Sequence, residues 1–268
     1  MRGHRARERS GGAGMHDMET RHYSPGLGRF LGVDPLSTSF PAYTPYHYVH
    51  GDPVNAIDPT GMSADTLRVS GSASAVQGFN DVVSRGTGGH YASNVDANGN
   101  VTLTPTGNGT PSRAEQAFAD EINGAVNDQG TTELELVDHN DASSSGVVIG
   151  DNGGYSGSPN AGRHVVDVGD VAAVGSGGVV TEQSVLSHEV AEARAMQTGG
   201  QTGSQAHNGA ARNAEARVTG HGVGMSQFQG SNGRGNITVP VTRGFNNVQV
   251  VTIRVKGGQV VGTSNNKP

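Results

Sequence analysis

The segment SVLSHEVAEARA, residues 184–195, carries three side chains whose types and spacing suit a metal ion: His188, Glu189 and Glu192. His188 and Glu192 are four residues apart, so on a helix they lie on the same face and can share one ion. Glu189 is rotated by about 100° from His188, which predicts a general base beside the ion. Compared with the zinc motif H-E-x-x-H, only the last donor differs, and a carboxylate oxygen binds Zn²⁺ at about 2.0–2.2 Å.

A catalytic zinc site needs a third protein ligand, and the chain offers two candidates. His207 lies fifteen residues beyond Glu192 and would complete a set of two histidines and one glutamate. Glu215 is the alternative third ligand; otherwise it would orient a ligand through a hydrogen bond. We expect His207 to be the ligand, because His188 would otherwise be the only nitrogen donor. A different interpretation leaves this helix with a solvated polar face and no ion.

The composition limits both the possible ligands and the size of the core. The chain has no cysteine, so only His, Asp or Glu can hold a metal. Only 33% of the residues are hydrophobic and 43 are glycine, which indicates a modest core among glycine-rich loops. No run of about 18 apolar residues is present, so we expect no membrane span. The start, MRGHRARERSGGAG, lacks the apolar region of a secretory signal.

The net charge of −6 conceals an uneven distribution. Residues 63–215 contain six basic and eighteen acidic side chains, whereas residues 216–268 contain six basic and no acidic ones. The acidic block argues against a basic nucleic-acid cleft, so we do not expect nucleic acid as a partner. Isolated histidines near predicted strand ends, such as His164, nevertheless keep a nuclease open as an alternative.

Local signals predict the elements that position the candidate site. Ser112 and Glu115 form a capping box for a helix over TPSRAEQAFADEINGAVND, and Thr181 caps the helix that carries His188. A further helix is expected over SQAHNGAARNAEARVTG, with Ser204 as its cap and Gly220 at its end. Residues 63–110 show only weak strand signals. Strands are predicted at 131–138, 145–150 and 163–174 and, around the turn at Gly257-Gly258, in the last part of the chain. These elements predict an α+β fold.

The first sixty residues combine short apolar-aromatic pieces with tight turns. Four motifs occur in order: Tyr23 with Gly28-Arg29-Phe30, then Asp34-Pro35, then Tyr46-His47-Tyr48 with Asp52-Pro53, and finally Asp58-Pro59-Thr60-Gly61. This segment, about 42 of the 268 residues, resembles the end of the RHS-repeat-associated core domain. Ser24 and Gly51-Asp52 depart from the family pattern, which often has Asp and Asn-Asn there.

The RHS resemblance implies a domain organisation and a biological role. RHS proteins are large secreted or surface β-shells that enclose a variable C-terminal segment, commonly a toxin used in bacterial competition. It implies the end of the core at 1–62, a linker or variable start of the toxin segment at 63–110, and a toxin domain at 111–268. Asp34 and Asp58 would be candidate autocleavage residues, with the cut after Met62. The implied partners are the RHS shell of a full-length parent, an immunity protein and a target in another cell, to which the effector is delivered.

The pieces HEVAEA, AHN and NAEARV resemble zincin-type metallopeptidase domains that polymorphic toxins carry. The resemblance covers about 35 residues, and Glu192 departs from the usual second histidine. It implies a small zincin-like domain, with a mixed sheet, a metal-binding helix and a second helix. The implied activity is zinc-dependent cleavage of a protein substrate in a target cell. A nuclease effector and a non-catalytic interaction tip of an RHS protein are the alternatives.

Overall fold

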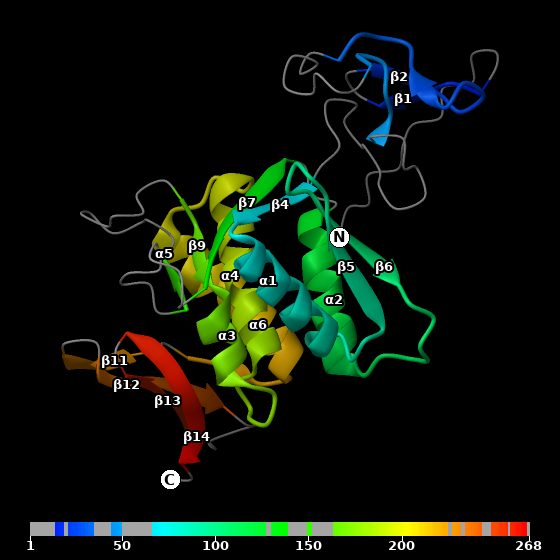
Figure 1. The fold of residues 1–268 in the computed structure, drawn as a ribbon. Helices are drawn as coiled ribbons and strands as arrows, with labels where there is room; N and C mark the ends of the chain where they lie inside the picture. The colour runs from blue at the N-terminus through cyan, green and yellow to red at the C-terminus, as the bar shows by residue number, and fades with distance from the viewer. Residues whose placement is uncertain are drawn as a thin grey trace. The chain divides into compact units, whose positions relative to one another are not determined.

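The computed structural model describes residues 14–18, 21–34, 44–49, 66–126, 130–138, 149–151, 163–224, 227–231, 234–242, 248–256 and 258–266. The chain divides into two compact units, residues 1–66 with 127–130 and residues 67–126 with 131–268. Helices and strands both contribute widely, so the predicted α+β fold is confirmed (Figure 1). Among the described helices, none is long and apolar enough to cross a membrane.

The first unit holds a small antiparallel sheet of β1 (His16–Met18), β2 (Arg21–Ser24) and β3 (Arg29–Phe30). Residues 25–28 form the turn between β2 and β3, and Gly28 takes a φ of 62° there, which glycine adopts without steric cost. The aromatic rings of Tyr23, Phe30 and Tyr48 pack together, with centroids 4.1 to 5.9 Å apart. This cluster is the core of the described part of the unit.

A mixed sheet lies at the centre of the second unit, in the order β4 (Thr66–Gly71), β7 (Thr131–Val137), β9 (Val165–Asp167) and β8 (Gly150–Asp151). β9 runs parallel to β7 and antiparallel to β8. Thr132, Leu134 and Leu136 alternate along β7 and are all buried, as expected for a strand with one face on the core. A separate hairpin joins β5 (Tyr91–Val95) to β6 (Val101–Pro105).

Helix α4 (Glu182–Gln197) is the most enclosed helix of the second unit. It packs against β7 and against α2 (Arg113–Val126), α3 (Val168–Val174) and α6 (Arg212–Thr219), and α1 (Ala73–Gly86) also contacts it (Figure 1). Burial therefore extends around most of its circumference and includes polar side chains. The buried positions are Glu182, Ser184, Val185, Leu186, Ser187, Glu189, Val190, Ala191, Glu192, Ala193 and Ala195.

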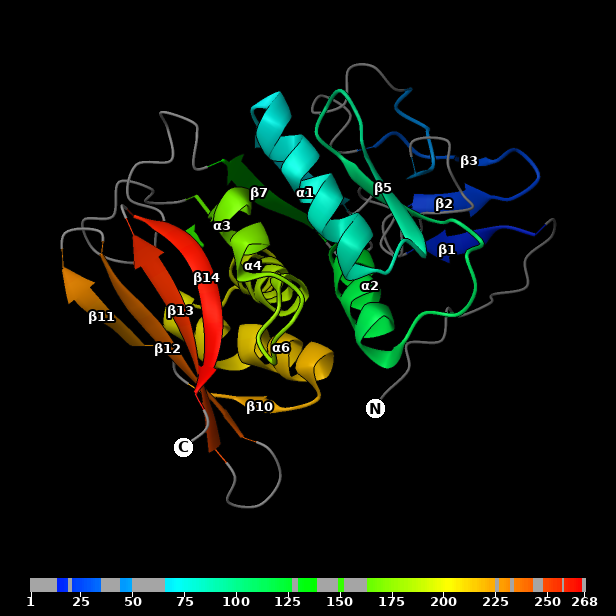
Figure 2. The ribbon, with the colours of Figure 1, turned by 60° about the horizontal axis from the view of Figure 1, so that its bottom comes forward.

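The last part of the chain forms a five-stranded antiparallel sheet. Its strands follow the order β10 (Gly222–Val223), β12 (Arg234–Thr242), β13 (Val248–Lys256) and β14 (Gln259–Asn266), and β11 (Gln227–Ser231) also pairs with β12. Figure 2 shows β14 alongside α3. The backbone N–H of Val260 donates to Asp170 of α3 at 2.7 Å, which fixes this sheet to the helical layer.

The predicted helix over residues 110–128 is confirmed as α2, with its capping box formed by Ser112 and Glu115. The predicted strand 163–174 is wrong beyond Asp167. The Asp167 carboxylate accepts hydrogen bonds from the N–H groups of Gly169 and Asp170, so the chain turns into helix α3 there. Of the predicted strand 145–150, only Gly150 and Ile149 lie among the described residues, and β8 begins at Gly150.

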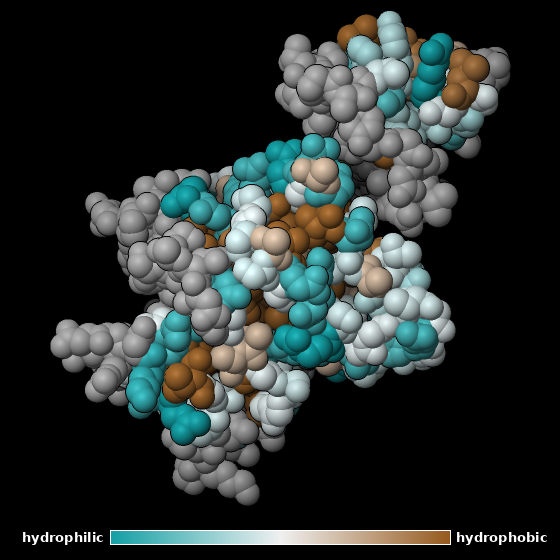
Figure 3. Space-filling view, viewed as in Figure 1, coloured by the Kyte–Doolittle hydropathy of each residue, from teal (hydrophilic) through white to brown (hydrophobic). Residues whose placement is uncertain are grey.

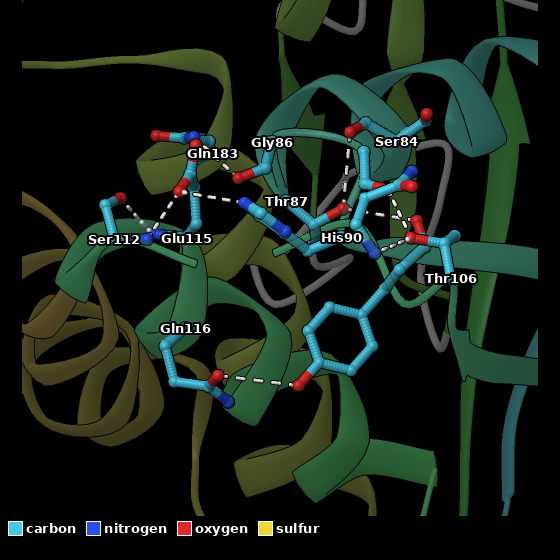
Figure 4. A network of polar contacts seen from close by, with 12 residues as sticks. Ser84, Gly86, Thr87, His90, Thr106, Ser112, Glu115, Gln116 and Gln183 are labelled. Carbon is cyan, nitrogen blue, oxygen red and sulfur yellow. Dashed lines mark hydrogen bonds and ion pairs between the residues drawn. The ribbon is translucent and has the colours of Figure 1, made fainter. Parts of the chain in front are cut away.

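The first turn of α4 is anchored to the end of α1 (Figure 4). The Gln183 side-chain amide donates to the Gly86 carbonyl at 2.6 Å. Arg85 forms an ion pair with Glu182 at 2.8 Å. Thr181 caps the helix, as predicted, through a reciprocal pair of bonds with Ser184. These contacts fix the start of the helix that carries the candidate site.

On the face of the second unit that Figure 3 shows, apolar residues lie in groups among hydrophilic and neutral ones. Apolar atoms contribute a large share of the surface of any folded protein, so such groups alone do not indicate a binding site. Most of the large exposed apolar side chains of the described residues lie in the first unit, namely Met15, Leu27, Leu31, Val33 and Tyr46, and two, Val248 and Val261, lie in the second.

Candidate metal centre

Three donor atoms from two segments meet beside α4. Nε2 of His188 lies 3.1 Å from Nδ1 of His207 and 3.4 Å from Oε2 of Glu192. Nδ1 of His207 lies 3.5 Å from the same Glu192 oxygen. Zinc bonds of about 2.0–2.2 Å to nitrogen and oxygen separate the ligands of a tetrahedral site by roughly 3.3–3.5 Å. The three atoms therefore outline one face of a tetrahedron, and this group can hold a metal ion.

The three candidate ligands differ in exposure. The Glu192 side chain is 4% exposed and that of His188 is 12% exposed, whereas His207 is 36% exposed. Of the three side chains, solvent therefore reaches His207 most easily. A catalytic zinc site requires an open position in addition to its protein ligands.

A turn of π-helix places His207. The sequence predicts one continuous helix capped by Ser204, but the structure has α5 (Gly203–Ala206), a π-helical segment (His207–Ala211) and α6. Thr202, not Ser204, caps α5 through a bond from the N–H of Gln205. The predicted end at Gly220 is confirmed, and this residue takes a left-handed conformation. π-Helical turns are rare and occur frequently at functional sites.

Glu215 contacts the other nitrogen of His188. Its Oε2 lies 3.4 Å from Nδ1 of His188, on the side of the ring away from Nε2, His207 and Glu192. A carboxylate in this position fixes the tautomer and the orientation of a ligating imidazole and raises its basicity. The structure thus brings all four predicted residues together, with Glu215 behind the ring of His188 and the other three around the candidate ion position.

The charge balance of the cluster is unusual for a protein interior. Burial favours the neutral ring of His188, but the Glu192 and Glu215 carboxylates, each 3.4 Å from a ring nitrogen, and the charge of Glu189 outweigh it and raise the pKa of His188 to about 10. In the absence of a metal ion, the His188 imidazolium is therefore a counter-charge to Glu192 and Glu215. A divalent cation at the same place would replace its proton.

The buried carboxylates contradict the interpretation of α4 as a helix with a solvated polar face. Glu192, Glu189 and Glu215 are 3%, 7% and 8% exposed. Burying an ionised carboxylate costs several kcal/mol unless a counter-charge and hydrogen bonds compensate for it. Each of the three contacts a histidine, which supplies that compensation.

Glu189 forms a second buried pair with a residue that the sequence did not assign to the site. Its Oε2 lies 2.9 Å from Nε2 of His164, which directly precedes β9 and is 3% exposed. His164, Glu189 and Glu192 also lie close enough together to hold an ion. The only sequence signal for His164 was a histidine near a predicted strand end, which does not indicate a partner on α4.

The other predicted residues lie in the first unit. Asp34 is buried and forms an ion pair with Arg21 at 3.2 Å, and the Arg21 guanidinium lies 3.7 Å from the centre of the Phe30 ring. Asp58 and Met62 lie outside the described residues. In the described part of the first unit, Asp34 thus holds Arg21 against the aromatic cluster.

Two surface grooves on the second unit have volumes of about 510 and about 500 Å³. Neither is lined by His188, Glu192 or His207. His164 is among the residues that line the second groove, together with residues of β4 and β7. Comparisons of the chain with family models, with curated proteins and with solved structures find no match.

Proposed function

We propose that the second unit is a zinc-dependent peptidase and that the chain is the C-terminal effector part of an RHS-type toxin. The observation that carries the enzymatic proposal is the group His188, Glu192 and His207, whose donor atoms have the spacing of a tetrahedral zinc site. The nitrogen-rich donor set with one carboxylate suits zinc better than calcium or magnesium, which prefer oxygen ligands.

The chain's own residues have distinct roles in this proposal. Zinc, when bound, polarises a carbonyl group and makes water a stronger acid. Glu189 is the adjacent carboxylate on the same helix, and it accepts the proton of the attacking water and returns it to the leaving amine. Glu215 holds the ring of His188 so that Nε2 faces the ion. His207, the most exposed ligand, marks the side on which a peptide would enter.

Exposed apolar residues support the proposed RHS origin of residues 1–62. Leu27, Val33 and Leu31 are 62%, 57% and 44% exposed on a unit whose described core is a single aromatic cluster. A sheet of this size buries too little to be stable alone, so a larger β-shell would cover these side chains. In this proposal the effector is delivered to a target cell, cleaves a protein there and is neutralised by an immunity protein in the producing cell.

The test combines metal analysis with toxicity. The full chain should purify with one zinc ion, and expression in a bacterial host should inhibit growth. His188→Ala should lose the ion, whereas Glu189→Gln should keep it but lose toxicity and protein cleavage by orders of magnitude. Glu133→Gln is a matched control, since Glu133 is an exposed glutamate of β7 outside the cluster.

Two results would contradict the proposal. Full zinc retention in His188→Ala would show that the ion is bound elsewhere. Undiminished toxicity of Glu189→Gln would show that no general base is needed at this position. Magnesium-dependent nicking of DNA or RNA by the purified chain would instead support the nuclease.

A further inference from the structure

In the described part of the chain, the buried ring of His164 has a hydrogen-bond partner on one side only. Nε2 contacts Glu189 at 2.9 Å, while Nδ1 is buried without a hydrogen-bond partner in the described part of the chain. A purely structural histidine in a protein interior usually has both nitrogens satisfied. Among the described residues, the hydrogen bond to Glu189 is therefore the interaction that fixes the position of the His164 ring.

We propose that His164 is a positioning residue that holds the Glu189 carboxylate in the orientation needed for peptide hydrolysis. This inference rests on the proposed peptidase function. The N–H of the imidazole donates to Oε2, so the other carboxylate oxygen remains the acceptor for the proton of water. The same bond restrains Glu189 from turning toward the ion and filling its open position as an additional ligand.

The scaffold around His164 suits a positioning role. Its carbonyl accepts a hydrogen bond from the N–H of Glu135 at 2.8 Å, and β9 begins at the next residue and pairs in parallel with β7. Glu189 projects from α4, which packs against β7. The bond between His164 and Glu189 thus links a side chain from the sheet to one from the metal-binding helix, and both are buried.

A second metal ion is the competing explanation of the same residues. His164, Glu189 and Glu192 have donor atoms close enough for an ion, and Glu192 would then bridge two ions. The distance of 2.9 Å between His164 and Glu189 is the usual length of an N–H···O hydrogen bond. This length favours a direct hydrogen bond between His164 and Glu189. The number of metal ions bound per chain distinguishes this explanation from a second metal site.

The experiment compares His164→Ala and His164→Gln with the unaltered chain, all purified in full length and loaded with zinc. The zinc content is measured by elemental analysis, and kcat and KM are measured separately with fluorescently labelled casein. We expect one zinc ion in all three proteins. The alanine variant should show a kcat about 10–100-fold lower with an almost unchanged KM. The glutamine variant should recover most of the activity, because its amide nitrogen reaches the position of Nε2 and donates the same bond.

His90→Ala is a matched control. His90 also has a buried Nδ1 without a hydrogen-bond partner in the described structure, and its Nε2 lies near a glutamate, 3.9 Å from Glu115. It lies outside the metal-capable groups. Its replacement should leave zinc content, kcat and KM unchanged.

The outcomes separate this inference from the proposed function. Two zinc ions in the unaltered chain, or loss of an ion in His164→Ala, would overturn the positioning role in favour of a second metal site. An unchanged kcat in His164→Ala, or a glutamine variant as inactive as alanine, would overturn it as well. If the unaltered chain binds no zinc or does not cleave protein, the peptidase proposal fails and this inference fails with it.

Discussion

Metal binding to the cluster should release a proton from His188, and its strength should therefore depend on pH. In the metal-free protein, burial lowers the pKa of His188, but the adjacent Glu192 and Glu215 carboxylates and the charge of Glu189 outweigh burial and raise this pKa to about 10. A metal needs the neutral ring. A pH of 7 lies about three units below the pKa of the ring, so removing the proton at this pH costs about 4 kcal/mol.

This cost predicts a definite pH dependence. Because the proton is displaced by the ion, the apparent affinity for zinc should rise about tenfold for each pH unit between pH 6.5 and 8.5. Isothermal titration calorimetry in buffers with different ionisation enthalpies gives the number of protons released. We expect about one proton from His188 for each ion bound.

Glu215→Gln is the informative variant for this prediction. It removes one of the three carboxylates that raise the pKa of His188, and it leaves Glu192, the proposed ligand, in place. The dependence of zinc affinity on pH should become shallower and the proton release smaller. If the affinity for zinc does not change between pH 7 and 8.5 and no proton is released, His188 is not protonated in the metal-free protein and the reasoning is refuted.

Further predictions concern stability. The metal-free protein should become less stable as the pH rises from about 6.5 to about 10, because the folded state binds the His188 proton more tightly than the unfolded state; thermal melts with a chelator would detect this. Residues 63–268 should unfold with nearly the same melting temperature as the full chain, since the second unit begins at Leu67; loss of the cooperative transition would contradict this division. Phe118→Ala should reduce the free energy of unfolding by about 3–5 kcal/mol in urea titrations, because Phe118 is 0% exposed, whereas Val248→Ala at an exposed position should have little effect.

The sequence is most informative where the determinants are local. Thr181 and the pair Ser112 and Glu115 mark the starts of α4 and α2, because a capping side chain bonds to the backbone only a few residues away. His188 and Glu192 are four residues apart, so they lie on the same face of any helix that contains them. These predictions need only the geometry of a single helix.

Two helices were not predicted, for different reasons. Asp167 lies inside an apolar run typical of a strand, yet its side chain caps α3 and ends β9 after three residues. Packing against the rest of the second unit determines this outcome more than propensity does. Helix α1, by contrast, carries local signals: Ser72 caps it, and its buried Ala75, Phe79, Val82 and Val83 follow helical spacing, although only weak strand signals were assigned to residues 63–110.

His164 illustrates the remaining difficulty at the site. It is separated from Glu189 by 25 residues, and the two meet only because β9 pairs with β7 while α4 packs against β7. Such a contact depends on the complete arrangement of sheet and helix. Spacing along the chain therefore identifies ligands on one helix, but it does not identify a partner that a strand contributes.

The burial of the cluster connects the proposed chemistry to the stability of the fold. Glu189 and Glu192 lie on α4, which packs against β7, α1, α2, α3 and α6, so their charges must be compensated for the core to form. The His188 proton provides part of this compensation in the metal-free state, and an ion provides it in the metal-bound state. A ligand that binds only the folded state stabilises it in proportion to the logarithm of its concentration. In this proposal, the stability of the second unit's core thus depends on whether the His188 proton or a metal ion compensates the buried carboxylates.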